Sequence, residues 1–268
     1  MCDEIFGVRN FINNIIWQKK YSPQNDARYL SDMHDFIMLY AKNKSNFNRN
    51  LLPRNDAQNK RYKNPDNDPR GPWKSSDLSA KRITEKDLYE IITPSGRKVL
   101  PPKGRSWVVG KEKFDELVNE NRIWFGENGN NVPSVKKFLN EVQDGTVPVT
   151  LWLREEVGDN QEARQILKAI FNESNAPFET PKPPRLLERL ILLASNENDI
   201  ILDSFAGSGT TAHAVLNLNK QDGGNRKFIL VEMEDYANDI TAERVKRVAK
   251  GYGEGKKAVA GTGGAFDF

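Results

Sequence analysis

The chain has 268 residues, of which 37% are hydrophobic and 29% are charged, and its formal net charge at pH 7 is +3. This length allows one large domain or two smaller ones, and the apolar content can support a core. A mean hydropathy of −0.69 predicts a large solvated part, and no apolar run approaches the ~20 residues that span a bilayer, which excludes a protein built on membrane-spanning helices.

Cys2 is the only cysteine, so no intramolecular disulfide can form and we expect a reducing compartment. Asp3 and Glu4 occupy the positions where a signal peptide carries positive charge. Both features predict a cytoplasmic protein. No cluster of Cys and His indicates a metal site, and we expect His34 and His213 to lie on the surface of a helix or strand.

The N-terminal part offers two strand-like runs, Asn10–Trp17 and His34–Ala41, joined by a polar link over Gln18–Met33. They predict an antiparallel pair with a long loop. Since two strands alone are not a stable sheet, the pair must find another partner in the fold.

A basic stretch follows from Lys42 to Arg82, with eleven Lys or Arg against four Asp. Cations suit DNA phosphates, Asn amides suit base edges and aromatic rings suit stacking on bases. Taken alone, the stretch is equally well interpreted as a flexible charged linker. The residues predicted to contact DNA, here, in the link and just beyond, are Lys19, Lys20, Arg28, Lys60, Arg61, Lys63, Arg70, Trp73, Lys74 and Arg105.

Between Ile83 and Trp152 the sequence predicts short elements separated by turn residues. They are a helix over Glu112–Asn119, a strand over Arg122–Gly126 and a helix over Ser134–Gln143. This pattern favours a small α+β insert, bounded roughly by Lys42 and Glu162.

The C-terminal part begins with a predicted helix over Asn160–Phe171. Ala176–Pro184 is too rich in proline for a helix or a strand, and Arg185–Ala194 has the apolar stripe of an amphipathic helix. The proline-rich segment is either a stiff linker or one wall of a pocket.

The most informative segment is Asp203–Thr211, with the sequence DSFAGSGTT. An apolar run of strand length, Asp199–Asp203, precedes it, and Thr210–Leu218 has helical composition. Gly207 and Gly209 therefore fall where strand turns into helix. Glycine there allows a positive φ and lets a ligand approach the free amides at the start of the helix.

A second predicted strand, Lys227–Glu232, ends in an acid 29 residues after Asp203, which is the length of one βαβ unit. An acid in this place typically holds the two hydroxyls of a ribose. The turn lacks the Lys of a phosphate-binding loop, so S-adenosylmethionine fits better than a nucleoside triphosphate. A dinucleotide enzyme stays open as an alternative, although the turn lacks the last glycine of G-x-G-x-x-G.

Three motifs in this order resemble motifs X, I and II of the β-group amino DNA methyltransferases: Phe178–Pro183, Asp203–Thr211 and Phe228–Glu232. The chain is most similar to the modification (Mod) subunit of type III restriction-modification systems. Further segments that look like that family are Asp3–Gly7, Trp17–Lys19, Tyr62–Trp73, Thr93–Gly96, Arg122–Gly126 and Glu156–Gly158.

The resemblance implies an α/β fold, a partial Rossmann-like S-adenosylmethionine-dependent methyltransferase core with an α+β target-recognition insert. Residues 1–42 would be a remnant of the catalytic half, 43–162 the target-recognition region and 163–268 the cofactor-binding half. Glu232 would take the ribose hydroxyls. The other cofactor-binding residues implied by the family are Phe178, Lys182, Pro183, Asp203, Phe205, Ala206, Gly207, Ser208, Gly209 and Thr210.

Family members methylate an exocyclic amino group of a base swung out of the duplex, and the type III resemblance implies N6 of adenine. It also implies double-stranded DNA, a second Mod subunit and a helicase-nuclease restriction subunit as partners. The family's catalytic motif, Asp/Asn-Pro-Pro-Tyr/Phe, is absent from these residues, since the Pro-Pro pairs at 101–102 and 183–184 have other neighbours.

We therefore assign no catalytic residue. We expect a fragment truncated at both ends, which forms most of the cofactor site without transferring methyl groups alone. The alternative is a non-catalytic DNA-binding remnant.

Overall fold

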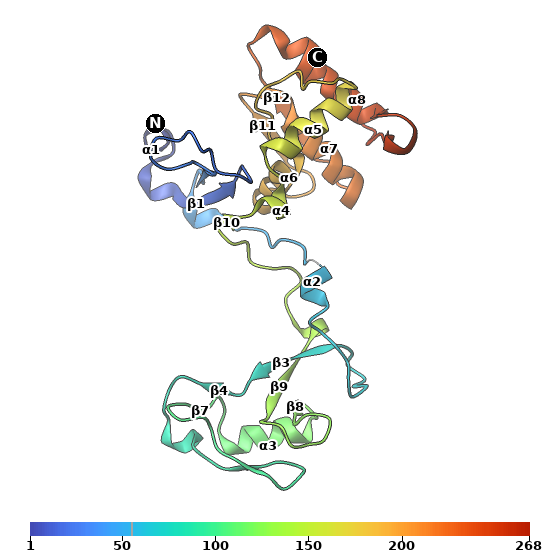
Figure 1. Ribbon diagram of the computed structural model, residues 1–268. Helices are drawn as coiled ribbons and strands as arrows, with labels where there is room; N and C mark the ends of the chain where they lie inside the picture. The colour runs from blue at the N-terminus through green and yellow to red at the C-terminus, as the bar shows by residue number, and fades with distance from the viewer. Residues whose placement is uncertain (55) are drawn as a thin grey trace. The chain divides into compact units, whose positions relative to one another are not determined.

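The computed structural model of the protein describes residues 1–54 and 56–268. The chain divides into two compact units (Figure 1). A terminal unit combines Met1–Leu52 with Val147–Phe268, and an inserted unit comprises Pro53–Thr146. The inserted unit is shorter at both ends than the segment 43–162 predicted for target recognition.

Helices and small sheets alternate in both units, which makes this a mixed α/β protein. In chain order the terminal unit contains α1 (Cys2–Phe6), β1 (Phe11–Gln18), β2 (His34–Tyr40), β10 (Leu151–Trp152), α4 (Arg154–Val157), α5 (Asn160–Phe171), α6 (Pro184–Ala194), β11 (Ile200–Asp203), α7 (Thr210–Asp222), β12 (Lys227–Leu230), α8 (Glu243–Lys250), β13 (Gly251–Tyr252) and β14 (Val259–Ala260). The inserted unit contains α2 (Asp56–Asn59), β3 (Trp73–Asp77), β4 (Ser79–Ala80), β5 (Ile91–Ile92), β6 (Lys98–Val99), β7 (Ser106–Trp107), α3 (Lys111–Asn119), β8 (Ile123–Trp124) and β9 (Ser134–Phe138). Across residues 1–54 and 56–268, no helix is long and apolar enough to cross a membrane.

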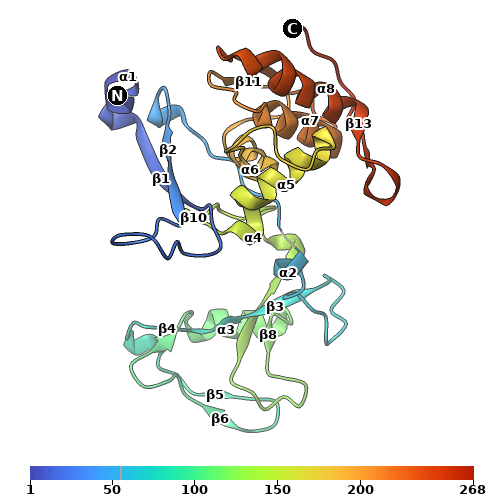
Figure 2. The same ribbon diagram turned by 45° about the horizontal axis from the view of Figure 1, so that its top comes forward.

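The N-terminal strands β1 and β2 pair antiparallel, as predicted, and lie side by side in Figure 2. β10 pairs in parallel with the other edge of β1 and supplies the partner that the pair required. Trp17 of β1 and Trp152 of β10 are buried and pack with Leu186 of α6. This cluster ties the N-terminal sheet to the C-terminal helices.

The C-terminal half of the terminal unit is built on one βαβ element. β11 and β12 pair in parallel, with Ile200 opposite Lys227, and α7 connects them. Every residue of α7 from Thr210 to Leu216 is buried, because α5, α6 and α8 pack around it. A helix enclosed on all sides favours small or apolar side chains, which accounts for the sequence TTAHAVL apart from His213.

The helix ends follow local chemistry. The Asp159 side chain accepts the Glu162 N–H at 2.8 Å and caps the start of α5. Asn172, at φ 55°, ends that helix in the left-handed conformation. Pro184 occupies the first turn of α6, where its missing N–H costs no hydrogen bond. The predicted helices over Asn160–Phe171 and Arg185–Ala194 are therefore confirmed, the second to within one residue.

Among the described residues, β11 pairs with β12 alone, so its second edge carries no strand. On one face of this strand pair the apolar side chains of Ile200, Leu202 and Ile229 are more than half exposed. The opposite face, with Ile201 and Phe228, packs on α6 and α7.

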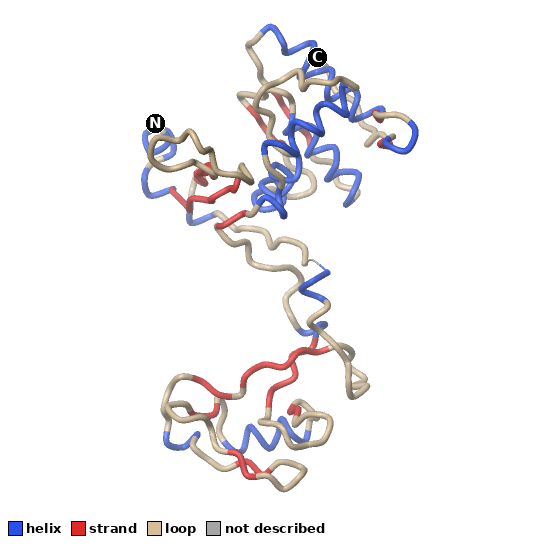
Figure 3. The backbone as a smooth tube through the Cα atoms, viewed as in Figure 1, coloured by secondary structure: helices blue, strands red, loops and turns tan. Residues whose placement is uncertain are grey.

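The inserted unit has short strands separated by long loops (Figure 3). Its main sheet has the order β3-β9-β8, and its core contains Ile91, Trp107, Phe114 of α3 and Ile123. The predicted helix over Glu112–Asn119 is confirmed as α3 and the predicted strand near Ile123 as β8.

The predicted helix over Ser134–Gln143 is wrong, because Ser134–Phe138 forms the central strand β9. The misleading residue is Lys136, which is 1% exposed and faces the interior with Phe138. Its ammonium pairs with Asp66 and Asp68, which compensates the buried charge. A buried lysine thus occupies an inward strand position that the sequence pattern marks as polar.

Candidate functional site

The turn between β11 and α7 requires glycine at two positions. Gly207 has φ 51° and Gly209 has φ 75°, in the left-handed region. A Cβ on Gly207 would lie 3.3 Å from the Phe178 ring, and one on Gly209 would lie 3.0 Å from the Thr241 carbonyl oxygen. The turn leads directly into the N-terminus of α7. The positive end of the helix dipole lies there, and the first N–H groups of a helix have no partner within the helix.

Glu232, just after β12, closes onto this turn. Its Oε2 accepts the Gly207 N–H at 2.7 Å, and its Oε1 accepts the N–H groups of Met233 and Glu234 at 2.9 and 3.1 Å. The bonds from Glu234, Gly207 and Met233 hold the pKa of Glu232 below its usual value. The ionised carboxylate has lone pairs left for further donors such as ribose hydroxyls.

Asp203 orients the turn from the strand side. Its Oδ2 accepts the Thr211 hydroxyl at 2.5 Å and its Oδ1 accepts the Phe205 N–H at 3.1 Å. The ring of Phe205 is 82% exposed, whereas Ala206 is buried. Asp203 therefore links the end of β11 to the first turn of α7, and Phe205 presents an apolar surface beside the turn.

The segment Phe178–Pro183 lies along the glycine turn, as the family resemblance implied, and is therefore one wall of the site rather than a linker alone. The Thr210 hydroxyl donates to the Lys182 carbonyl at 3.2 Å. The ring of Phe178 meets that of Tyr236 edge-on, with 5.4 Å between centroids. The Lys182 ammonium lies 5.7 Å from the centroid of the Trp17 ring. Residues far apart in the chain are thus gathered around the turn.

Two residues of this site were missed by the sequence reasoning. The Thr241 hydroxyl donates to the Gly207 carbonyl at 2.5 Å, and Arg244 of α8 donates to Ser208 and Thr210. Both lie beyond the acid at Glu232, where no motif was recognised. The available signal was the helical spacing of Thr241, Arg244 and Val248, which places both polar residues on the buried face of the helical segment formed by the π-helix Asn238–Ala242 and α8.

The prediction that His213 lies on the surface is wrong, because its side chain is 4% exposed within α7. Burial, helped by the neighbouring positive Arg244, lowers the pKa of His213 to about 3. The neutral ring can accept from Arg244, whose Nη2 lies 3.2 Å from its Nδ1. His34 of β2 is exposed, as expected. Within the described residues, no group of three or more His, Cys, Asp or Glu is placed to hold a metal ion.

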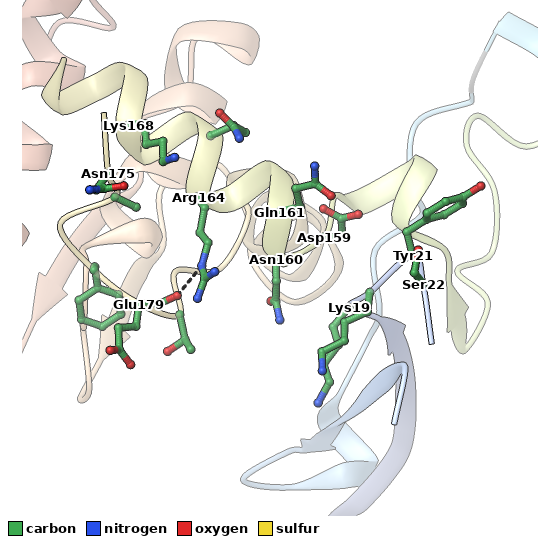
Figure 4. A pocket seen from close by; sticks show the side chains of 15 residues that line it. Lys19, Tyr21, Ser22, Asp159, Asn160, Gln161, Arg164, Lys168, Asn175 and Glu179 are labelled. Carbon is green, nitrogen blue, oxygen red and sulfur yellow. Dashed lines mark hydrogen bonds between the residues drawn. The ribbon is translucent and has the colours of Figure 1, made fainter. Parts of the chain in front are cut away.

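A cavity of about 680 Å³ opens between α5, the Phe178 segment and the loop after β1 (Figure 4). The residues that line it are mostly polar, with cations at Lys19, Lys20, Arg164 and Lys168. Arg164 reaches from α5 to the far wall, where its Nε donates to the Glu179 carbonyl at 2.7 Å. One residue predicted to bind cofactor, Phe178, and two predicted to contact DNA therefore line the same space.

All nine cations predicted to contact DNA are exposed or half-buried. Lys60, Arg61 and Lys63 of the inserted unit are exposed, as is Arg28 of the terminal unit. Lys74 is half-buried beside the Tyr62 ring, and Lys20 lines the cavity just described. The four exposed cations present their charge to solvent, where an anionic partner can approach. Lys19 lines the same cavity and pairs with Asp35 at 2.5 Å.

Three other residues of that prediction are engaged within the inserted unit. Trp73 is 4% exposed and its indole N–H donates to Asp66 at 2.8 Å. Arg70 forms a two-pronged bond with Asp68, at 2.8 and 2.7 Å. Arg105 donates to the Ser79 hydroxyl at 2.9 Å. The burial of Trp73 argues against the base stacking expected of it, because its ring belongs to the interior.

Comparisons with known proteins find one matching family and several similar proteins. The model of the DNA methylase family matches residues 1–243. The type III restriction-modification enzyme StyLTI Mod subunit of Salmonella typhimurium is 31% identical over 93% of this chain and 39% of its own length. The EcoP15I Mod subunit of Escherichia coli is 29% identical over 93% of the chain and 45% of its own length. The EcoPI Mod subunit of Escherichia phage P1 is 26% identical over 93% of the chain and 44% of its own length. The chain thus spans less than half the length of these relatives.

Proposed function

The chain belongs to the DNA methylase family, and we propose that its terminal unit binds S-adenosylmethionine for the methylation of adenine N6 in DNA. The observation that carries the proposal is the 2.7 Å bond between the Gly207 N–H and the Glu232 carboxylate. It unites the glycine turn and the strand-end acid at the carboxyl edge of a parallel strand pair, where nucleoside ligands bind in open α/β sheets.

In this proposal β11, α7 and β12 are part of a Rossmann-like methyltransferase core. Glu232 accepts the ribose hydroxyls, and the exposed ring of Phe205 and the half-buried ring of Phe178 offer apolar contacts. The first turn of α7 receives the carboxylate end of the ligand, because the helix dipole favours negative charge there. The bound cofactor supplies a methyl group activated by a sulfonium.

We further propose that the inserted unit contacts double-stranded DNA. Its exposed cations at Lys60, Arg61 and Lys63 suit phosphates. The three relatives described above are named Mod subunits of type III restriction-modification enzymes. By analogy we propose a second Mod subunit and a restriction subunit as partners of this chain. The 268 residues contain no Asp/Asn-Pro-Pro-Tyr/Phe sequence, so no catalytic residue is assigned.

Calorimetric titration of the chain with S-adenosylmethionine, and separately with NAD, tests the cofactor proposal. Binding of S-adenosylmethionine should weaken about tenfold or more in Glu232→Gln, because a hydrogen bond to a charged group contributes about 1.5–3 kcal/mol. Glu234→Gln is the matched control, since the same chemical change then falls on an exposed side chain two residues away. Binding of NAD without binding of S-adenosylmethionine would overturn the proposal.

The DNA proposal is tested by measuring duplex affinity against salt concentration. Phosphate contacts release counterions, so the affinity should fall steeply with salt, and replacing Lys60, Arg61 and Lys63 by Gln should flatten the slope by about three. An affinity that does not change with salt concentration would refute the proposal that the inserted unit contacts DNA phosphates. The second candidate function, DNA binding without chemistry, is separated by assaying transfer of a labelled methyl group from S-adenosylmethionine to the same duplex.

A further inference from the structure

The glycine turn rests on a buried arginine. Arg244 of α8 has no exposed surface. Its Nη1 donates to the Ser208 hydroxyl at 2.9 Å, the Ser208 carbonyl at 3.2 Å and the Thr210 hydroxyl at 2.8 Å. Its Nη2 lies 3.2 Å from Nδ1 of His213. All four bonds go to the turn or to the first turn of α7.

The charge of this guanidinium is not balanced in the usual way. Buried arginines ordinarily pair with a carboxylate, since an isolated buried charge is costly. Within the described part of the chain, no carboxylate accepts a hydrogen bond from Arg244; its acceptors are hydroxyl and carbonyl oxygens and a neutral imidazole. Burial lowers the pKa of Arg244 to about 9, so the group stays protonated at neutral pH.

The charge of Arg244 lies close to a second source of positive potential, the N-terminus of α7. The N-terminus of α7 carries the positive end of the helix dipole, and Arg244 contacts it through Ser208, Thr210 and His213. An anionic group at the mouth of the turn would therefore meet both sources of positive potential. Two carboxylates also lie at the turn, and neither accepts a hydrogen bond from Arg244. Glu232 accepts the N–H groups of Gly207, Met233 and Glu234, and Asp203 accepts the Phe205 N–H and the Thr211 hydroxyl.

We infer that Arg244 is a positioning residue for the proposed cofactor site. It holds Ser208 and Thr210 in the ligand-binding conformation, and its charge selects a nucleoside that carries a carboxylate over the same nucleoside without one. This inference rests on the proposed function for the identity of the ligand. The positioning itself rests only on the four contacts of the guanidinium.

Hydrogen exchange in the full 268-residue chain tests the positioning without any ligand. In Arg244→Met, the amides of residues 208–211 should exchange at least about tenfold faster, because the charged hydrogen bonds that fix the turn are lost. Arg247→Met is the matched control. Arg247 lies on the same helix, pairs with Glu243 at 2.7 Å and bonds to Ile170 rather than to the turn. Equal exchange at residues 208–211 in the wild type and Arg244→Met would overturn the positioning.

Ligand selectivity tests the role of the charge. Affinities for S-adenosylhomocysteine and for 5′-methylthioadenosine, which lacks the amino-acid end, are compared by calorimetry. Arg244→Met should weaken the first about tenfold or more and the second less than about threefold, since only the first carries a carboxylate. Arg244→Lys keeps the charge and should retain most of the preference. Equal losses for both ligands would show a structural role alone and overturn the selectivity.

Two further controls keep the outcomes separate. If the wild-type chain binds neither ligand, the proposed function fails, while hydrogen exchange still decides the positioning. If Arg244→Met does not fold, Thr210→Val removes one acceptor of the guanidinium at nearly constant volume. It should then raise exchange at residues 208–211, and unchanged exchange would count against the inference.

Discussion

Replacing Gly209 by alanine is the sharpest test of how the turn is built. Gly209 has φ 75°, and a Cβ there would lie 3.0 Å from the Thr241 carbonyl oxygen and 3.4 Å from its Cγ2. Gly223, at the other end of α7, has nearly the same conformation, with φ 74°, but its Cβ would meet nothing within 4 Å. The two glycines have nearly the same φ, and they differ in whether an added Cβ would contact a neighbouring residue.

The expected magnitudes follow from this difference. A left-handed conformation costs an L-residue about 1–2 kcal/mol, and this cost applies to both variants. The loss of chain entropy in the unfolded state is also common to both. Gly209→Ala must in addition displace the Thr241 carbonyl, which bears on the segment that holds the turn. We expect about 1 kcal/mol of destabilisation for Gly223→Ala and about 2–3 kcal/mol for Gly209→Ala.

Hydrogen exchange of the α7 amides measures this destabilisation in the terminal unit alone, because it reports local opening free energies. The same two variants should differ in affinity for S-adenosylmethionine, with Gly223→Ala unchanged and Gly209→Ala weakened. Equal destabilisation by the two substitutions would refute the reasoning, since it would mean that the contact with Thr241 contributes nothing.

Three further predictions concern charge. Backbone N–H groups lower the pKa of Glu232 below 4.5, the usual value for a glutamic acid. The affinity of the protein for S-adenosylmethionine should therefore stay constant as the pH falls to 4.5 and decrease only at lower pH. An affinity that halves near pH 4.5 would contradict the hydrogen bonds to Glu232. Burial lowers the pKa of His213 from 6.5 to about 3, so its contribution to stability is complete above pH 6.5 and is lost as the pH falls toward 3, by roughly 4–5 kcal/mol at most. Unfolding followed from pH 7 to 4 should show a flatter dependence in His213→Gln. Lys136→Met leaves the carboxylates of Asp66 and Asp68 without their buried cation and should destabilise the inserted unit by about 3–5 kcal/mol in denaturant unfolding, whereas adding Asp66→Asn should recover part of the loss.

Much of the βαβ element was predictable because its signals are local. An apolar run, a glycine turn and a helical stretch follow one another without interruption from Asp199 to Leu218. Helix α5 was predicted with its bounds for the same reason: Asp159 caps its start and Asn172 ends it. Glu232 stands 29 residues after Asp203, which is the length of one βαβ unit. This spacing predicted that Glu232 lies at the end of the second strand, close to the glycine turn, and its hydrogen bond with Gly207 agrees with that position.

The failures share a physical cause, which is that polar side chains acquire their environment from distant partners. The local sequence around Lys136 is typical of a surface residue. In the fold its ammonium is buried against Asp66 and Asp68, which lie 70 and 68 positions earlier in the chain. The same holds for Trp73, whose indole belongs to the interior of the inserted unit.

By itself, therefore, the sequence determined where the glycine turn stands and which acid faces it, because these depend on residues joined by short, regular spacings. Only the tertiary structure decided what holds the turn. Arg244 lies 36 residues beyond Ser208. Its spacing with Val248 places it on the apolar face of α8, but the sequence does not show which distant residues its guanidinium bonds to. Packing of α8 against α7 removes water from the guanidinium, and the loss of water is what makes its bonds to Ser208 and Thr210 decisive.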